Sequence, residues 1–330
     1  GDFTWDTPDE RGSADSQSAP VRPNLRLSAR NVPVDDDLLA ALPPDQRQWL
    51  QRLGPTGRID LEGAVLPPQA GDAEAAAAGD FHFEFNLDLR NATFLPIDDQ
   101  PLVTDATARL RVTPQRVVFS DLVGKIVDAR LTADGVATWA DATPLLNFRA
   151  DAQELQLNDR LYRALPPAAR QAWDMVRPDG TADVQLTYSG AAPQPKDGVA
   201  TPALPTTQPA ATIAAAAGDN RGFELTIKPR ELAVTPEVFP VRLDSVAGRV
   251  IVGPDRIRLE DLSAKRGDGR YRLTGFATRD ADPVWNLHLQ AEHVLLDDAV
   301  RNALPETLAL LVQRLDMRGN VSVDFPKFVY

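Results

Sequence analysis

The chain has 330 residues, of which 43% are hydrophobic and 25% are charged, a balance that provides for sizeable cores and excludes an intrinsically disordered protein. Its net charge of −12 argues against a nucleic-acid partner, because binding to a phosphate backbone depends on clustered Lys and Arg. The absence of cysteine excludes disulfides, thiolate nucleophiles and thiolate metal sites.

No apolar run reaches the roughly 18 residues that a membrane-spanning helix needs. The first residues, Gly1 to Phe3, lack the basic and apolar regions of a signal peptide. We therefore expect any targeting or anchoring segment to lie upstream of this sequence.

The sequence repeats itself from residue 24 onward. The block from Asn24 to Gly57 recurs from Asn147 to Gly180 and again from Asn286 to Gly319, and the segment from Phe83 to Gly135 matches that from Phe223 to Gly275. Tandem copies are typical of an array of supersecondary units. We predict a loose segment at 1–23, the C-terminal part of a repeat unit at 24–66, an Ala/Pro-rich linker at 67–80, a full unit at 81–190, an Ala/Pro/Thr-rich linker at 191–221 and a second full unit at 222–328.

Within a unit the dominant period is two. From Phe81 to Arg90 every second residue is Phe or Leu and the others are polar, which predicts a half-buried strand. Thr113 to Arg116 and Gly253 to Arg256 have the composition of hairpin turns. The predicted fold is α+β and dominated by β-structure: tandem antiparallel meander units that form an elongated curved sheet or groove, with a short helical segment, broken by proline, in each unit.

The helical segment follows the strand that begins at Leu145 and its equivalents. Asp36, Asp159 and Asp298 precede it, where a capping or first-turn carboxylate is favourable. An Ala-Leu-Pro sequence then interrupts the helix, since proline lacks the backbone donor. We expect a second short helix after it, ended by Gly57, Gly180 or Gly319, and then the last strand of the unit.

Residues with catalytic or metal-binding chemistry are sparse. The histidines, His82, His288 and His293, are not matched by histidine in the other copies. The Asp35 to Asp37 run lacks the spacing and distal glutamate of a calcium loop. No nucleophile elbow, phosphate loop, zinc motif or dinucleotide fingerprint occurs. We expect no enzymatic activity, no cofactor and no metal site.

The feature that repeats most faithfully is the apolar alternation of the strands, and it allows two interpretations. The apolar faces are either filled by the helices of their own unit or left partly open as a trough suited to acyl chains. The groove candidates are Phe81, Phe83, Phe85, Leu87, Leu110, Val112, Phe119, Phe223, Leu225, Ile227, Ile257 and Leu259.

These long meander strands, the Ala-Leu-Pro corner (Ala41 to Pro44, Ala164 to Pro167, Ala303 to Pro305), the Trp-bearing helix and the following Gly-led strand resemble the AsmA-like proteins of the bacterial envelope. These are related to the repeating-β-groove, bridge-like lipid transfer proteins. The resemblance implies a periplasmic body, an inner-membrane anchor outside this sequence and a hydrophobic groove for glycerophospholipid or another acyl lipid. It supplies no catalytic residues and identifies no envelope protein partner. The long Ala/Pro/Thr insertions depart from the compact pattern of the family and affect the unit boundaries.

Two other classes of protein remain as alternatives. A structural or adhesive β-repeat protein would bury its apolar faces completely and form no lipid conduit. A hydrolase built on the array would need a cluster of non-repeated polar residues, such as His82, His288 and Asp98.

Overall fold

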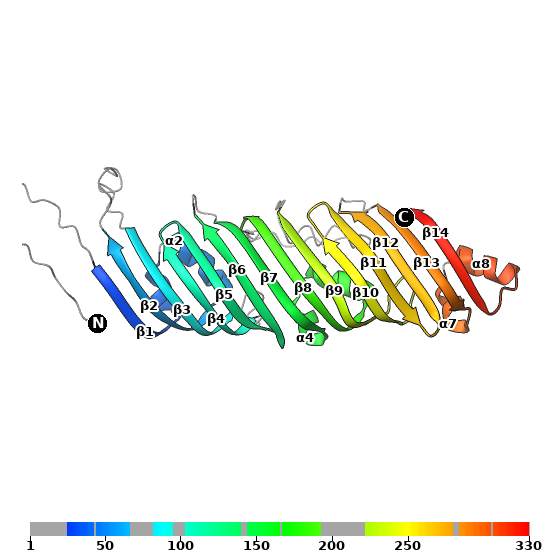
Figure 1. Cartoon of the computed structure of the whole chain (residues 1–330), viewed down its shortest axis with the longest axis horizontal. Helices are drawn as coiled ribbons and strands as arrows, with labels where there is room; N and C mark the ends of the chain where they lie inside the picture. The colour runs from blue at the N-terminus through cyan, green and yellow to red at the C-terminus, as the bar shows by residue number, and fades with distance from the viewer. Residues whose placement is uncertain are drawn as a thin grey trace, which may run out of the picture. The chain divides into compact units, whose positions relative to one another are not determined.

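The computed structural model describes residues 25–42, 44–66, 82–94, 103–139, 144–165, 167–192, 222–279, 284–304 and 306–329. Over these residues, fourteen strands pair in chain order into one sheet that is not closed, and neighbouring strands run antiparallel (Figure 1). The helices are few and short. The predicted class, a β-dominated antiparallel meander, is therefore confirmed. The predicted loose segment at 1–23, the linker at 67–80 and nearly all of that at 191–221 lie outside the described residues, as do Phe81 and Asp98.

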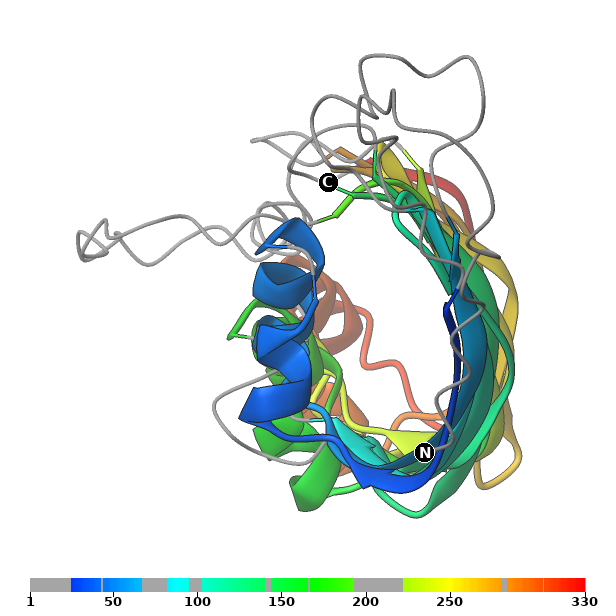
Figure 2. The same ribbon diagram turned by 90° about the vertical axis from the view of Figure 1, so that its left-hand side faces the viewer.

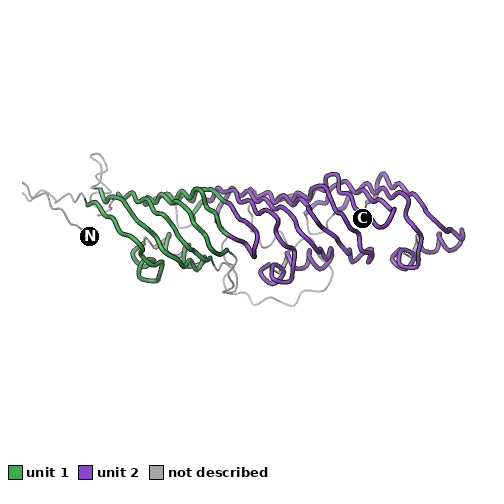
Figure 3. The backbone as a smooth tube through the Cα atoms, turned by 60° about the horizontal axis from the view of Figure 1, so that its bottom comes forward, with its two compact units in different colours: residues 1–124, 133–145 green, residues 125–132, 146–330 purple. Residues whose placement is uncertain are grey.

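The chain divides into two compact units (Figure 3), the first formed by residues 1–124 and 133–145. Its elements are β1 (Leu25–Pro33), α1 (Asp36–Ala40), α2 (Pro44–Leu53), β2 (Thr56–Leu66), β3 (His82–Phe94), β4 (Val103–Thr113) and most of β5 (Arg116–Ile126). The predicted turn between Thr113 and Arg116 joins β4 to β5. The strand β6 (Ala129–Thr138) is shared between the two units.

The second unit comprises residues 125–132 and 146–330. Its elements are β7 (Leu145–Leu157), α4 (Asp159–Ala164), α5 (Pro167–Val176), β8 (Pro178–Ala191), β9 (Phe223–Val234), β10 (Leu243–Val252), β11 (Arg256–Arg266), β12 (Gly269–Thr278), β13 (Trp285–Leu295), α7 (Asp298–Ala303), α8 (Glu306–Arg314) and β14 (Asn320–Val329). A pair of short helices thus connects β7 to β8 and β13 to β14, as another pair connects β1 to β2 in the first unit.

The helix pairs begin with the same capping arrangement. The side chain of Asp35 accepts a hydrogen bond from the backbone N–H of Leu38 at 3.0 Å, and Asp297 accepts one from Val300 at 2.9 Å. Asn158 caps α4 in the same way. Asp36, Asp159 and Asp298 occupy the first turn that follows, where a carboxylate interacts favourably with the helix dipole.

The prediction that glycines end the second helices is wrong. The helix α2 ends at Leu53 and α5 ends at Val176, whereas Gly57 and Gly180 lie within β2 and β8 with φ of 134°. A Cβ on Gly180 would lie 1.9 Å from the carbonyl oxygen of Glu231 on β9. These glycines therefore permit the close approach of two strands rather than helix termination.

The strand that precedes each helix pair carries a bulge. Glu154 on β7 has a left-handed φ of 54°, and its backbone N–H donates to Oδ1 of Asp183 on β8 at 3.0 Å. The equivalent Asn31 donates to Asp60 at 2.8 Å. Because a bulge leaves its extra backbone N–H without a partner on the next strand, an oxygen-bearing side chain at this register position satisfies it. Asp183 also accepts a bond from Arg230 Nε at 2.7 Å, which ties β9 into the same network.

We expect Asp183→Ala to lower the free energy of unfolding by about 1–3 kcal/mol, because the Glu154 N–H loses its acceptor. The hydrogen bond from Arg230 is the main reason that the pKa of Asp183 lies below its ordinary value, and the bond from Glu154 adds to it. A carboxylate with a lowered folded-state pKa stabilises the protein above the unfolded pKa and loses this effect as pH falls through the folded pKa. Urea unfolding at neutral pH and below pH about 4 should therefore show the deficit of the variant shrinking in acid. A deficit that is unchanged at low pH would contradict this assignment.

Candidate functional site

The first unit carries an apolar face that is continuous across its strands. Phe85 on β3 lies opposite Gly63 on β2 and Val112 on β4, and Leu87 lies opposite Leu61 and Leu110 in the same way. Residues directly opposite each other in an antiparallel pair project to the same side of the sheet. We call this side the inner face of the first unit: Leu61, Val65, Phe83, Phe85, Leu87, Leu110 and Val112.

The second unit has an equivalent inner face. Leu225 on β9 lies opposite Leu186 on β8 and Val252 on β10, and Val252 in turn lies opposite Ile257 on β11. The row continues through Ala277 on β12, which lies opposite Ile257, and Trp285 on β13, which lies opposite Ala277. The inner face of the second unit is defined by Val184, Leu186, Phe223, Leu225, Ile227, Val250, Val252, Ile257, Leu259, Ala277, Trp285 and Leu287.

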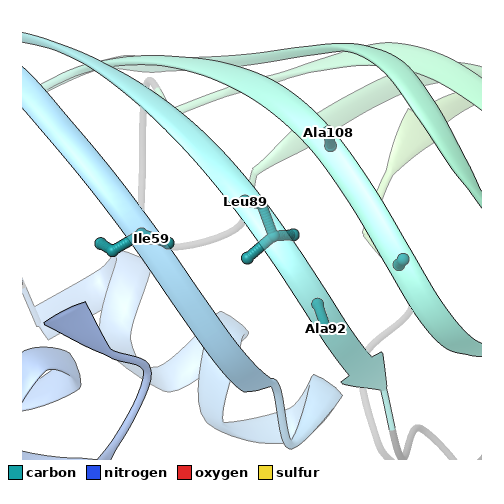
Figure 4. Close-up of a cluster of buried hydrophobic side chains, with 5 residues drawn as sticks. Ile59, Leu89, Ala92 and Ala108 are labelled. Atoms are coloured by element: carbon teal, nitrogen blue, oxygen red, sulfur yellow. The ribbon is translucent and has the colours of Figure 1, made fainter. Parts of the chain in front are cut away.

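The helices bury the end of each inner face at which they join the strands, and Val252 and Ala277 at the other end of the second inner face are buried as well. In the first unit, Ile59, Leu89 and Ala92 form a buried cluster beside the helical segment, with exposed fractions of 5%, 9% and 0% (Figure 4). The corresponding clusters of the second unit include Leu155 packed with Trp173 of α5 and Val300 of α7 packed with Val312 of α8. These are ordinary cores, formed where the strands meet the helices.

The groove candidates lie farther along the strands and are only half-buried. This holds for every candidate that the structure describes, whereas their neighbours beside the helices are fully buried. Leu87 and Leu110 contact the buried cluster of the first unit and mark where the core gives way to accessible surface. The described candidates of β3, β4, β9 and β11 are thus brought onto the inner face of their unit, and solvent reaches them. Phe119 of β5 is half-buried as well.

Gln46 connects α2 to the β4–β5 turn, which lies at the strand ends opposite those where α2 leads into β2. Its side chain is 2% exposed, and its Nε2 donates to the carbonyl oxygens of Thr113 at 3.2 Å and Pro114 at 2.9 Å in the β4–β5 turn. The C-terminal end of α2 leads into β2 at the other edge, where Thr56 pairs with Thr93. The helix therefore runs from the strand ends at the β4–β5 turn to the opposite strand ends, where β2 begins.

The strands of the first unit bend around this helix. A ten-residue helix is about 15 Å long, whereas the eleven-residue β4 measures about 36 Å along its contour. Figure 2 shows α1 and α2 facing the inner side of the curved strands. The half-buried candidates line the inside of this curve, between the sheet and the helix.

The opposite, polar face is stabilised by cross-strand ion pairs. Arg109 of β4 contacts Asp121 of β5 at 3.4 Å, and Arg249 of β10 contacts Glu260 of β11 at 3.3 Å. Arg109 and Arg249 occupy equivalent positions of the two matching segments, since they lie 26 residues after Phe83 and Phe223, respectively. These pairs are exposed and contribute little stability individually, so they chiefly keep this face hydrated.

The histidines are not brought together. His82 is exposed on β3, while Nε2 of His288 lies 2.8 Å from Oδ1 of Asp324 on β14, and this contact lowers the pKa of Asp324. The backbone N–H of His293 donates to Ser322 at a bulge. Over the described residues, no three His, Asp or Glu side chains are placed to hold a metal ion.

The sequence analysis does not identify two buried polar residues near the inner faces. One is Gln46, and the other is Arg279, whose guanidinium lies over the ring of Phe223 with 5.1 Å between Cζ and the ring centroid. The sequence did contain a signal for Arg279: it lies two positions after Ala277, so its side chain has the parity of the inner face. Nothing in the sequence around Gln46 indicates its partners, because they belong to a turn more than sixty residues away.

None of the helices in the described part of the chain combines the length and the apolar character needed to cross a bilayer. Comparison with known proteins gave no match to any protein family, to any curated protein or to any solved structure.

Proposed function

We propose that this chain is a segment of an envelope protein that shelters the acyl chains of phospholipid, or of another acyl lipid, on its inner faces during transport between membranes. The supporting observation is that each unit carries a continuous apolar face on which the described groove candidates are only half-buried. An apolar surface of this extent is normally buried or functional in a soluble protein.

The energetics favour an acyl chain as the occupant. Each methylene removed from water contributes about 0.8 kcal/mol, so complete shelter of about fourteen methylenes is worth roughly 11 kcal/mol. An inner face of aliphatic and aromatic side chains needs no specific polar contact to provide this shelter. The role is therefore one of binding and conduction, without a chemical step.

The proposed location follows from the resemblance to AsmA-like proteins. We place the chain in the periplasm, held at the inner membrane by a segment that is not part of this sequence. Lipids of both membranes would be accessible to a protein in that position. No nucleic acid is proposed as a partner, since the net charge of −12 disfavours it.

Native mass spectrometry of the chain, expressed in a bacterial periplasm and purified without detergent, tests this proposal. We expect mass increments that match phospholipids and that disappear after extraction with organic solvent. The extracted protein, refolded and incubated with phosphatidylglycerol vesicles, should recover them. A chain that is folded and free of lipid under both conditions would instead support the structural or adhesive alternative.

A further inference from the structure

Arg279 is buried although its charge is only partly satisfied. The residue is 6% exposed, and its Nη1 donates to the carbonyl oxygen of Gly253 in the β10–β11 turn. Its Nε and Nη2 are shielded from water and have no hydrogen-bond partner among the residues that the structure describes. A buried cation with free donors is costly, and such a group calls for an acceptor that the described residues do not supply.

The guanidinium lies on the inner face of the second unit. Arg279 follows β12 directly, and its backbone N–H is bonded to the carbonyl oxygen of Asp255 at 3.0 Å. Phe223, the ring it covers, begins β9, and β10 and β11 lie between these two strands. The side chain must therefore extend across the inner face to reach that ring.

Its position marks one end of the apolar rows. Phe223 and Leu225 are half-buried neighbours on β9, and Val252 and Ala277 are the last inner-face residues of β10 and β12. The helices α4, α5, α7 and α8 connect strands at the opposite edge. A molecule on this face would thus meet aliphatic side chains along its length and the Arg279 cation at the strand ends opposite those that the helices connect.

The charge on Arg279 persists at neutral pH. Burial lowers the pKa of its guanidinium, and the negative charge of Asp255 opposes that shift. The guanidinium of arginine is nevertheless not deprotonated in proteins, so the group stays charged. Among the described residues, no ion pair joins Asp255 to Arg279.

We propose that Arg279 binds the anionic head group of an acyl lipid, through a phosphate or carboxylate oxygen, while the acyl chain lies on the inner face of the second unit. The proposal rests on the proposed function and adds the class of lipid: one anionic group at the end of an acyl chain. Arginine suits this task because its planar donors match both oxyanions and its charge is weakly hydrated. Neutral acyl lipids would leave Nε and Nη2 unpaired.

The test compares ligands on the wild-type chain. Delipidated protein is titrated with phosphatidylglycerol, oleate, diacylglycerol and inorganic phosphate, and bound ligand is measured by native mass spectrometry. We expect phosphatidylglycerol or oleate to bind at least about tenfold more tightly than diacylglycerol. The tighter of the two identifies the oxyanion as phosphate or carboxylate. Inorganic phosphate should not compete at concentrations comparable to those of the lipids.

Substitution of Arg279 provides the second arm. Arg279→Met should reduce the affinity for the anionic lipids to that for diacylglycerol, whose own binding should not change, and Arg279→Lys should recover part of the loss. The matched control, Arg270→Met, removes the same charge from the exposed side of β12 and should leave every affinity unchanged.

Equal wild-type affinity for anionic and neutral lipids would overturn the role of Arg279 and leave the proposed function standing, even if Arg279→Met failed to fold. Strong competition by inorganic phosphate would show an anion site unrelated to lipid and would also overturn it. Failure of every lipid to bind would overturn the proposed function as well.

Discussion

Replacement of Phe85 or Leu225 by glutamate is expected to remove most of the bound lipid while leaving the circular dichroism spectrum native. Both side chains are half-buried on an inner face. A carboxylate there can remain hydrated in the free protein, but it would have to be desolvated under an acyl chain. That penalty is several kcal/mol, which corresponds to a loss of at least about a hundredfold in affinity.

Asn86→Glu is the matched control for Phe85→Glu, because Asn86 is the next residue of β3 and is exposed on the polar face. It adds the same charge and should leave bound lipid unchanged. Lipid content is measured by extraction and mass spectrometry, and folding by circular dichroism and thermal unfolding. If Phe85→Glu and Leu225→Glu both unfold the protein, the positions belong to an ordinary core and the groove interpretation is wrong.

Gly180→Ala is expected to produce the largest loss of stability, about 4 kcal/mol from combined backbone strain and overpacking. Gly180 has φ of 134°, and its new Cβ would lie 1.9 Å from the carbonyl oxygen of Glu231. That oxygen belongs to the backbone of β9, so relief requires the two strands to separate. Urea unfolding followed by circular dichroism measures the difference.

Gly267→Ala separates the two contributions. Gly267 also has a left-handed φ, of 57°, but a Cβ there has nothing within 4 Å. It should therefore cost only the conformational penalty, about 1 kcal/mol. Equal losses for the two variants would show that close strand approach at Gly180 is unimportant.

Local sequence patterns were sufficient to predict the strands and their faces. Side chains alternate along a strand with a period of two, so the assignment of Phe83, Phe85 and Leu87 to one face needs no knowledge of their partners. The first-turn positions of Asp36 and Asp298 were equally local, and the caps Asp35 and Asp297 directly precede them, because a cap bonds to a backbone N–H three residues later.

Features that depend on a neighbouring strand could not be predicted in this way. Gly57 and Gly180 were assigned to helix ends, although their conformation is required by strands that follow much later in the chain. The bulges at Asn31 and Glu154 depend on acceptors 29 residues away. The hydrogen bonds of Gln46 depend on a turn in β-structure that its own helix does not reveal.

The exposure of the inner faces was the decisive quantity that the sequence left open. An apolar residue of correct parity is either buried, as Leu89 and Val252 are, or half-buried, as Phe85 is. The difference depends on how the strands bend around the helices, which is a tertiary property.

Photocrosslinking along β3 tests the central claim most directly. Benzoylphenylalanine is placed singly at Phe83, Glu84, Phe85 and Asn86 in protein expressed in a bacterial periplasm, and lipid adducts are identified by mass spectrometry after illumination. If acyl chains occupy the inner face, adducts form at positions 83 and 85 and are absent at 84 and 86. Adducts at all positions alike, or at none of them, would contradict the account.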